Sequence, residues 1–513
     1  MRVPARVATA LLAALTLVGC SSAVAEQKSR SGGQGAAGGT LVAAIGTDLV
    51  PAQFYSGLQA ASTIAGLTYE SLIDYPVDSL EPQPSLATSW KLAEDGLSLT
   101  LDLQPEATFQ TGRDLTSDDV KFSLQTYADP ARAAQLQRTA AAITSYDTSD
   151  PDRIVLGFDH PVSNIFDLLD QVPIIDRESI AGFDSGTKYV GTGPFTFDSW
   201  TPNSRLEFSR YDDYWGEKAL LDEVEVRVIK DSTSQISALR SGQVDVVLGA
   251  PARDLEQLER SGEFRAERLT GAEADLYVGT NVTHPALADV EVRQAIAYAI
   301  DKRRIAEEVY RDRARAHDLP WPEYSPAYDP ELDQRYARDV AKAGELLDGR
   351  RVPTLPLAYM AGNPNHEAAA QIVQANLAEV GVETELQPVE TSQFLKQLIG
   401  AEFEALWVTE HTFAQYTPST LTVSAYPFNA DGNASRFVDA DYQRAADAAW
   451  KVADGTGAEA SRRYAELSRQ LLEHLFLIEL VETTQEHALS SAVDDIAWSK
   501  RGEIDLARTT VSR

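Results

Sequence analysis

From residue 40 onward the chain alternates between short apolar runs and longer segments in which apolar residues recur every three or four positions. Strand-like runs occupy residues 41–45, 97–103 and 224–229. Helical spacing occupies residues 119–127, 292–310, 367–380 and 458–475, which predicts amphipathic helices. The alternation of the two patterns predicts an α/β protein. The chain shows no fixed internal repeat.

The composition limits the classes of function. The 513 residues carry a formal charge of −32, which disfavours a nucleic-acid-binding protein. With 43% hydrophobic and 24% charged residues, most of the chain is predicted to be globular rather than disordered, with about two to four domains.

The amino terminus has the features of an export signal. Arg2 and Arg6 precede an apolar run at residues 7–18, which is too short to be a transmembrane helix. The run ends in Leu-Val-Gly-Cys at residues 17–20, which looks like a bacterial lipobox. The resemblance implies cleavage of residues 1–19, a lipid on Cys20 and a location at the outer face of the cytoplasmic membrane. The alternative is a core cysteine near a cleaved secretory signal. As the only cysteine, Cys20 cannot form an internal disulfide.

Residues 20–39 are small, polar and glycine-rich, which is typical of a flexible tether. Residues 33–38 fit the dinucleotide-binding pattern G-x-G-x-x-G. However, a strand-like run follows this pattern where a helix is required, and no strand precedes it. The match is attributed to linker composition, and no cofactor is expected.

Several segments resemble motifs of family 5 extracellular solute-binding proteins, the oligopeptide- and dipeptide-binding type of bacterial ABC importers. They are AEDGLSLTL at residues 93–101, GRDLTSDDV at 112–120, GTGPF at 191–195, YDDYWG at 211–216, LRSGQVD at 239–245 and VRQAIAYAID at 292–301. Their order and spacing are those of the family, and the resemblance spans most of residues 40–510.

The residues of these motifs also have structural interpretations. Gly96 and Gly242 lie between elements, where a positive φ is needed. Thr116 or Ser117 is a suitable N-cap for the following helix. Arg293 lies eight residues before Asp301 on one predicted helix face. We interpret these residues as scaffold rather than as ligand contacts.

The resemblance implies the two-lobed type II periplasmic-binding-protein fold in its large three-domain form, with lobes that close on a ligand by hinge motion. The implied first lobe comprises residues 40–75, 187–272 and 476–513. An inserted domain comprises residues 76–186, and the second lobe comprises residues 273–475. Crossings between the lobes are expected near Tyr277 and after His474.

Ligand contacts in such a cleft are expected from both lobes. The first lobe offers Asp48, Phe54 and Tyr55, which follow the first strand. The second lobe offers the segment at residues 403–418, where a strand leads into a polar and aromatic loop. The contacts predicted from the second lobe are Trp407, Glu410, His411, Phe413, Tyr416 and, further along the chain, Asn429.

This second-lobe segment departs from the family pattern. In peptide-binding members it resembles W-x-x-D-Y-x-D-P, and a nearby aspartate pairs with the peptide's α-ammonium group. Here Glu410 and His411 stand where Asp-Tyr is expected, and Pro418 comes later than in the pattern. A buried ammonium group without a carboxylate partner would cost several kcal/mol. Glu410 can supply that partner, and the aromatic residues can face a ring or a cation.

The function that follows is solute capture for an ABC permease and ATPase, without chemistry. The predicted protein is a lipid-anchored monomer that binds a peptide or peptide-like solute. The open alternatives are a sugar, opine or metal-chelate binder of the same fold, a receptor or adhesin that has lost its transporter, and an anchored carbohydrate hydrolase. No metal site is expected, because His366 begins a segment that lacks the second histidine of the zinc-protease pattern.

Overall fold

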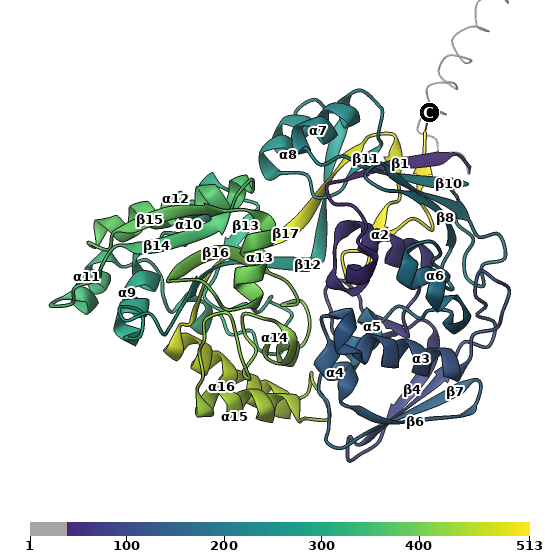
Figure 1. Cartoon of the computed structure of the whole chain (residues 1–513), viewed down its shortest axis with the longest axis horizontal. Coiled ribbons are helices and arrows are strands. Elements are labelled where there is room, and N and C mark those ends of the chain that lie inside the picture. Colours follow the sequence, from purple (N-terminus) through teal and green to yellow (C-terminus); the bar gives the residue numbers. More distant parts are fainter. Residues whose placement is uncertain (1–37, 513) are drawn as a thin grey trace, which may run out of the picture.

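The computed structural model describes residues 38–512. Its main sheet runs through both halves of the molecule, in the order β15-β14-β16-β12-β17-β11-β1-β10-β9-β8, with β13 paired to β17. Figure 1 shows two lobes on either side of the long strands β12 (Phe264–Thr280) and β17 (Leu477–Ser490). We call these two strands the crossing strands.

The first lobe contains one end of the main sheet. Its strands are β1 (Thr40–Ile45), β8 (Phe195–Thr201), β9 (Arg205–Arg210), β10 (Glu223–Val228) and β11 (Val246–Val247). Its helices are η1 (Pro51–Ser56), α2 (Gln59–Thr68), α7 (Ser232–Arg240) and α8 (Ala252–Glu259). Short pairs complete it: β2 (Ile73–Asp74) with β3 (Gln83–Pro84), β18 (Val493–Asp494) with β21 (Thr510–Val511), and β19 (Ala497–Trp498) with β20 (Ile504–Asp505).

A separate four-stranded sheet packs with short helices beside this lobe. Its order is β4 (Ala87–Leu92), β5 (Ser98–Leu103), β7 (Arg153–Phe158) and β6 (Ile143–Asp150). The helices are α3 (Ser117–Ala128), η2 (Pro130–Arg132), α4 (Gln137–Ala141), α5 (Ile165–Gln171), η3 (Arg177–Ser179) and α6 (Ile180–Ser185). We call this region the small-sheet region.

The second lobe contains the other end of the main sheet. Its strands are β13 (Ala314–Ala316), β14 (Leu355–Met360), β15 (Thr384–Val389) and β16 (Leu406–His411). Its helices are α9 (Val290–Ala299), α10 (Lys302–Glu308), η4 (Leu332–Gln334), α11 (Val340–Leu347), α12 (Pro364–Glu379), α13 (Thr391–Ile399), α14 (Pro418–Ser424), α15 (Ala440–Trp450) and α16 (Ala458–His474).

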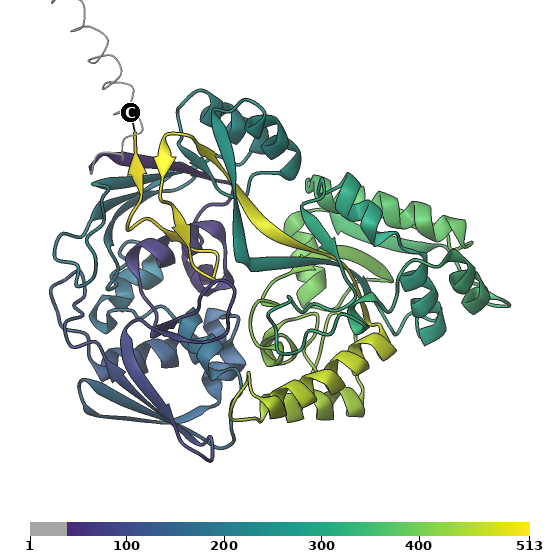
Figure 2. The same ribbon diagram turned by 180° about the vertical axis from the view of Figure 1, so that it is seen from behind.

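The crossing strands connect the lobes by continuous antiparallel pairing. At one end β17 pairs with β11, and at the other end β12 pairs with β16. Figure 2 shows both strands running from one lobe to the other. The register shifts between Arg268 and Glu273 and again at Leu276, so the ladder is irregular where the chain passes between the lobes. The lobe boundary predicted at residues 272–273 lies inside β12.

The secondary structure agrees with most of the sequence predictions. The helices predicted at residues 119–127, 367–380 and 458–475 are α3, α12 and α16, with ends that differ by at most three residues. The single helix predicted at residues 292–310 is wrong, because two helices, α9 and α10, occupy it. Asp301 ends the first by acting as the N-cap of the second, where its carboxylate accepts a hydrogen bond from the backbone N–H of Arg304.

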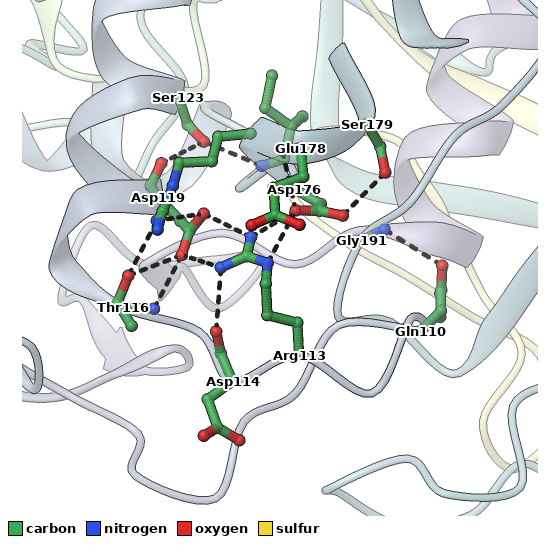
Figure 3. A network of polar contacts seen from close by, with 12 residues as sticks. Gln110, Arg113, Asp114, Thr116, Asp119, Ser123, Asp176, Glu178, Ser179 and Gly191 are labelled. Atoms are coloured by element: carbon green, nitrogen blue, oxygen red, sulfur yellow. Dashed lines mark hydrogen bonds and ion pairs between the residues drawn. The ribbon is translucent and has the colours of Figure 1, made fainter. Parts of the chain in front are cut away.

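The GRDLTSDDV motif forms a scaffold network in the small-sheet region (Figure 3). Thr116 is the N-cap of α3, and it forms a capping box with Asp119. Both guanidinium ends of Arg113 donate to the buried carboxylate of Asp119, at 2.6 and 2.9 Å, and the same guanidinium bonds Asp176. The motif therefore ties α3 to the loop before η3, as the structural interpretation predicts.

Arg293 also has a structural role. Its guanidinium donates to the backbone oxygens of His474 and Leu287, and it is 4% exposed. Burial lowers its pKa to about 10. It joins α9 to the end of α16, directly before the chain enters β17.

Candidate functional site

A cavity lies where the first lobe, the small-sheet region and the second lobe meet. It encloses about 1110 Å³ of space free of protein atoms, part of it continuous with solvent. Phe54 and Tyr55 of η1 line it from the first lobe, and Tyr127 of α3 lines it from the small-sheet region. Thr412, Phe413 and Gln415 line it from the loop after β16. The crossing strands add Glu273 and His487, and the segment before β20 adds Arg501 and Glu503. We call this cavity the first compartment.

A second, more open compartment adjoins the first. It is lined by Glu410, His411, Tyr426 and Asn429 of the second lobe and by Arg138 of α4. The two compartments share Gln135, Thr412 and Phe413. Phe413 has a φ of 78°, a left-handed conformation that is uncommon for a bulky residue. The ring is therefore held between the two compartments by a strained backbone.

The charges of the first compartment are mostly paired. The guanidinium of Arg501 lies 2.7 Å from Glu503, 3.0 Å from Asp170 and 3.2 Å from Asp74. Glu273 accepts hydrogen bonds from the backbone N–H of Gly271 at 2.8 Å and from the hydroxyl of Tyr324 at 3.1 Å. Lys500 is a second cation here, because its ammonium group donates to the hydroxyl of Tyr324 at 3.1 Å. Two cations therefore face the four carboxylates of Asp74, Asp170, Glu273 and Glu503.

Polar contacts between α5 and α14 join the small-sheet region to the second lobe. The buried carboxylate of Asp167 accepts hydrogen bonds from the backbone N–H of Thr417 at 3.0 Å and from its hydroxyl at 2.6 Å. The hydroxyl of Thr420 also donates to it at 2.6 Å. Asn164 donates to the hydroxyl of Thr420 at 3.0 Å, and Ser163 donates to Ser419 at 2.9 Å. We call this set the α5–α14 contact. These hydrogen bonds join the small-sheet region to the second lobe at this edge.

The predicted residues fall into three groups. Phe54, Tyr55 and Phe413 line the first compartment, and Glu410, His411, Phe413 and Asn429 line the second. Asp48, Trp407 and Tyr416 line neither compartment. Ligand contact by the residues of the first two groups stays a prediction.

The three residues outside the compartments have partners within the protein, and ligand contact by them stays a prediction. Asp48 accepts hydrogen bonds from the indole of Trp200 at 2.9 Å and from the backbone of Asn203 at 2.6 Å. Trp407 is fully buried and stacks on Phe403 at 4.7 Å. The Tyr416 hydroxyl donates to Asp170 at 2.7 Å and belongs to the core between the regions. The strand β16 is buried on both faces, so Trp407 packs in the second-lobe core.

His411 belongs to a buried group of acids and histidines in the crossing region. Its Nε2 lies 3.2 Å from Glu479, and its Nδ1 lies 4.0 Å from Asp275, which also faces His317 at 3.4 Å. Burial raises the pKa of Asp275 well above its usual range, and burial lowers the pKa of His317 well below its own. Both shifts favour uncharged forms, which avoids the cost of isolated charges between the crossing strands.

Most residues of the first compartment were not selected from the sequence, and three of them have polar side chains of particular interest. These three are Gln415, His487 and Arg501. Gln415 lies inside the segment at residues 403–418, which was chosen for its aromatic and charged side chains. Its position in that segment could therefore have identified it as a lining residue. His487 and Arg501 follow the return of the chain to the first lobe, and only the predicted crossing after His474 indicated that this segment would border the cleft.

Among residues 38–512, no three His, Cys, Asp or Glu side chains are grouped so that they could hold a metal ion. In the same residues, no helix has both the length and the apolar character needed to cross a bilayer. Cys20 and the predicted signal lie outside the described residues.

Comparisons with known proteins identify the fold and the family. The model of the bacterial extracellular solute-binding proteins, family 5, matches residues 81–433. The probable di/tripeptide-binding protein 5 of Pseudomonas aeruginosa is 26% identical over 69% of this chain and 73% of its own length. The oligopeptide-binding protein AppA of Bacillus subtilis, solved with a nonapeptide, superposes with a TM-score of 0.79 at 20% identity, covering 93% of this chain and all of AppA.

A third relative has a different ligand. The binding protein AgaA of A. tumefaciens R10, solved with agropinic acid, superposes with a TM-score of 0.80 at 22% identity. The match covers 93% of this chain and 99% of AgaA. The predicted α/β fold of the periplasmic binding proteins is therefore confirmed over almost the whole chain.

Proposed function

Because the chain belongs to family 5 of the bacterial extracellular solute-binding proteins, we propose that it captures a peptide or peptide-like solute in the cleft between its lobes. It then delivers the solute to an ABC permease with its ATPase. The observation that carries this proposal is the first compartment, which is lined by residues of both lobes and of the small-sheet region. The family consists of binding proteins rather than enzymes. The predicted function, ligand binding without catalysis, is therefore preferred to the alternative of a carbohydrate hydrolase.

The proposed mechanism is capture by closure. The crossing strands supply the hinge, and the α5–α14 contact forms on the closed side of the cleft. The lobe and domain boundaries of the sequence analysis stay a prediction, in which β12 is shared between the lobes. Closure buries the solute against both compartments and excludes water from its polar groups.

The proposed attachment is a lipid on Cys20, with residues 20–39 as the tether. It is supported by the sequence alone, since Cys20 lies outside the described residues. Cys20→Ser is expected to release the protein from the membrane or to leave an uncleaved precursor. Finding the mature wild-type protein unlipidated in the culture supernatant would contradict the proposal.

A non-peptide ligand is the second candidate. Two observations favour it: AgaA was solved with agropinic acid, and the second-lobe segment departs from the peptide-binding pattern at Glu410 and His411. Glu410 is the discriminating residue, because it lines the second compartment with its side chain half exposed.

The test is titration calorimetry of free tripeptides and N-acetylated tripeptides against wild type and Glu410→Gln. If a peptide ammonium group pairs with Glu410, the variant binds free tripeptides several-fold more weakly, an effect limited by the solvent around this carboxylate. Acetylated tripeptides should not distinguish the two proteins. Glu404→Gln is the matched control, because Glu404 is exposed on the same segment and lines neither compartment. Failure of wild type to bind any free peptide would favour the non-peptide candidate.

A further inference from the structure

The second lobe is joined covalently to the rest of the molecule through the two crossing strands. The chain enters this lobe at the end of β12, at Thr280, and leaves it at the start of β17, at Leu477. Its other contacts with the small-sheet region are noncovalent, so a hinge motion at the crossing strands acts directly on them. The α5–α14 contact and the hydrogen bond of Tyr416 are among these contacts.

Tyr416 places a side chain of the second lobe in the core of the first lobe. Its ring is fully buried among residues of the first lobe and the small-sheet region, and its centroid lies 6.2 Å from that of Tyr75. Its hydroxyl donates to the carboxylate of Asp170 at 2.7 Å. Asp170, on α5, therefore receives one of its hydrogen bonds and part of its cover from the lobe across the cleft.

The charged groups around Asp170 come from the first lobe. The guanidinium of Arg501 lies 3.0 Å from its carboxylate, and the backbone N–H of Tyr75 donates to it at 3.1 Å. Two further acids share this guanidinium, and a lysine adds a second positive charge nearby: Asp74, Glu503 and Lys500.

The second lobe faces the two acids of α5, Asp167 and Asp170, with uncharged side chains. The ionisable groups on its side are the phenols of Tyr416 and Tyr464, and burial raises the pKa of both above its usual range. The remaining donors are the threonines of the α5–α14 contact. The second lobe thus removes water from these acids and, among residues 38–512, brings no cation to them.

The acids of α5 bind a proton more tightly under this cover than in water. Burial raises the pKa of Asp170 from 3.8 to about 6, although Arg501 and the Tyr416 hydroxyl act to lower it. Burial also raises the pKa of Asp167, although hydrogen bonds from the two threonines act to lower it. Withdrawal of the second lobe admits water to α5, which returns both pKa values toward their usual range.

We propose that closure of the second lobe onto α5 is coupled to the uptake of a proton by Asp170, so that the cleft closes more readily in mildly acidic surroundings than at neutral pH. This inference rests on the proposed function, because it concerns the closure that holds the solute. It makes Asp170 a positioning residue of the closed form, acting through Tyr416.

The sign and size of the effect follow from the shift at Asp170. A group whose pKa is higher in the closed form takes up a proton on closure, so acid favours that form. The advantage is fully present below about pH 4 and is lost as the pH rises through about 6. For a pKa that moves from 3.8 to about 6, the closed-to-open ratio rises up to about tenfold between pH 7 and pH 5.

The test is hydrogen exchange of the intact protein, read by mass spectrometry on peptides that cover residues 413–424, at pH 5, 6 and 7. The backbone N–H of Thr417 donates to Asp167 at 3.0 Å, so its exchange reports withdrawal of the second lobe without any ligand. Each rate is divided by the intrinsic exchange rate at that pH, which gives a protection factor. Small-angle scattering at the same pH values follows the radius of gyration.

Wild type should be protected about 5- to 10-fold more at pH 5 than at pH 7 and should have the smaller radius at pH 5. Asp170→Asn imitates the protonated acid and should remove most of this pH dependence. Tyr416→Phe keeps the ring but removes a hydrogen bond that lowers the pKa of Asp170, so its midpoint should move to higher pH. Asp152→Asn is the matched control and should behave as wild type, because Asp152 is an exposed acid of the small-sheet region outside the contact.

Equal protection of wild type at pH 5 and pH 7 overturns the inference, as does a pH dependence that persists unchanged in Asp170→Asn. Should that variant fail to fold, Tyr416→Phe decides, and a midpoint that stays or moves to lower pH overturns the inference. Protection that varies with pH at a constant radius also overturns it, because the contact then opens without movement of the lobe.

Failure of this inference is separable from failure of the proposed function. If free tripeptides bind in the calorimetry described above while one of these contrary results is obtained, the proposed function survives and only the coupling to a proton fails. If wild type binds no free peptide, peptide capture fails whatever the exchange experiment shows.

Discussion

The α5–α14 contact predicts a measurable energetic link between one hydroxyl and cleft closure. The Thr420 hydroxyl donates to the buried carboxylate of Asp167 at 2.6 Å and accepts a hydrogen bond from Asn164 at 3.0 Å. Thr420→Val removes the hydroxyl with little change in shape. A hydrogen bond to a charged group contributes about 1.5–3 kcal/mol, and Asn164 also loses its acceptor. A cost of about 2 kcal/mol shifts the closed-to-open ratio about 30-fold toward the open form.

The assay is small-angle X-ray scattering, which reports the radius of gyration of the unliganded protein. Thr420→Val should give a larger radius than wild type, and a bound ligand should reverse the increase. Thr422→Val is the matched control. The Thr422 hydroxyl is equally buried but donates only to the backbone oxygen of Ser419 within the same segment, so its loss should leave the radius unchanged.

One result would refute this reasoning. If Thr420→Val lowers the melting temperature but leaves the radius and the ligand affinity as in wild type, the contact persists in the open form. In that case α14 moves together with the small-sheet region, and the α5–α14 contact is not part of the closing surface.

Two further predictions concern stability. A Cβ on Gly279 would lie 2.0 Å from the ring of Trp407. Gly279→Ala should therefore reduce the free energy of unfolding by about 1–3 kcal/mol or more and lower the melting temperature. Gly344→Ala, with open space around the added carbon, should be neutral or stabilising, and equal melting of both variants would contradict the packing assigned to Trp407. Burial raises the pKa of Glu70 to about 7, and its oxygens accept from Tyr214 and Trp215. The folded chain therefore holds this proton where the unfolded chain has lost it, so the contribution of Glu70 to stability decreases as pH rises from about 4.5 to 7. Glu70→Gln should melt with a weaker pH dependence across this window, and an unchanged dependence would contradict the shift.

The fold could be predicted because its signals are local. Gly96 and Gly242 both adopt a φ of 71°, and Thr116 caps α3, as their positions in the sequence indicated. Such residues act on their immediate neighbours, so a short motif contains the necessary information. Asp301 shows the limit: its N-cap role divides a segment whose apolar spacing is continuous.

The site could be predicted only in part, because its residues are distant in the sequence. Tyr55, Gln415 and His487 become neighbours of one cavity only after the crossing strands bring the lobes together. Trp407 was predicted as a ligand contact, and the structure buries its ring in the second-lobe core. An aromatic residue at the end of a strand can face a ligand or the core, and the burial of β16 on both faces, which decides between them, depends on helices elsewhere in the chain.

Native mass spectrometry of the protein purified from the bacterium that encodes it tests the central claim most directly. We expect one small molecule per chain, released chemically unchanged on denaturation. Recovery of a chemically altered molecule formed at catalytic rates would contradict the account. So would wild-type protein that holds no solute and acquires none from the growth medium.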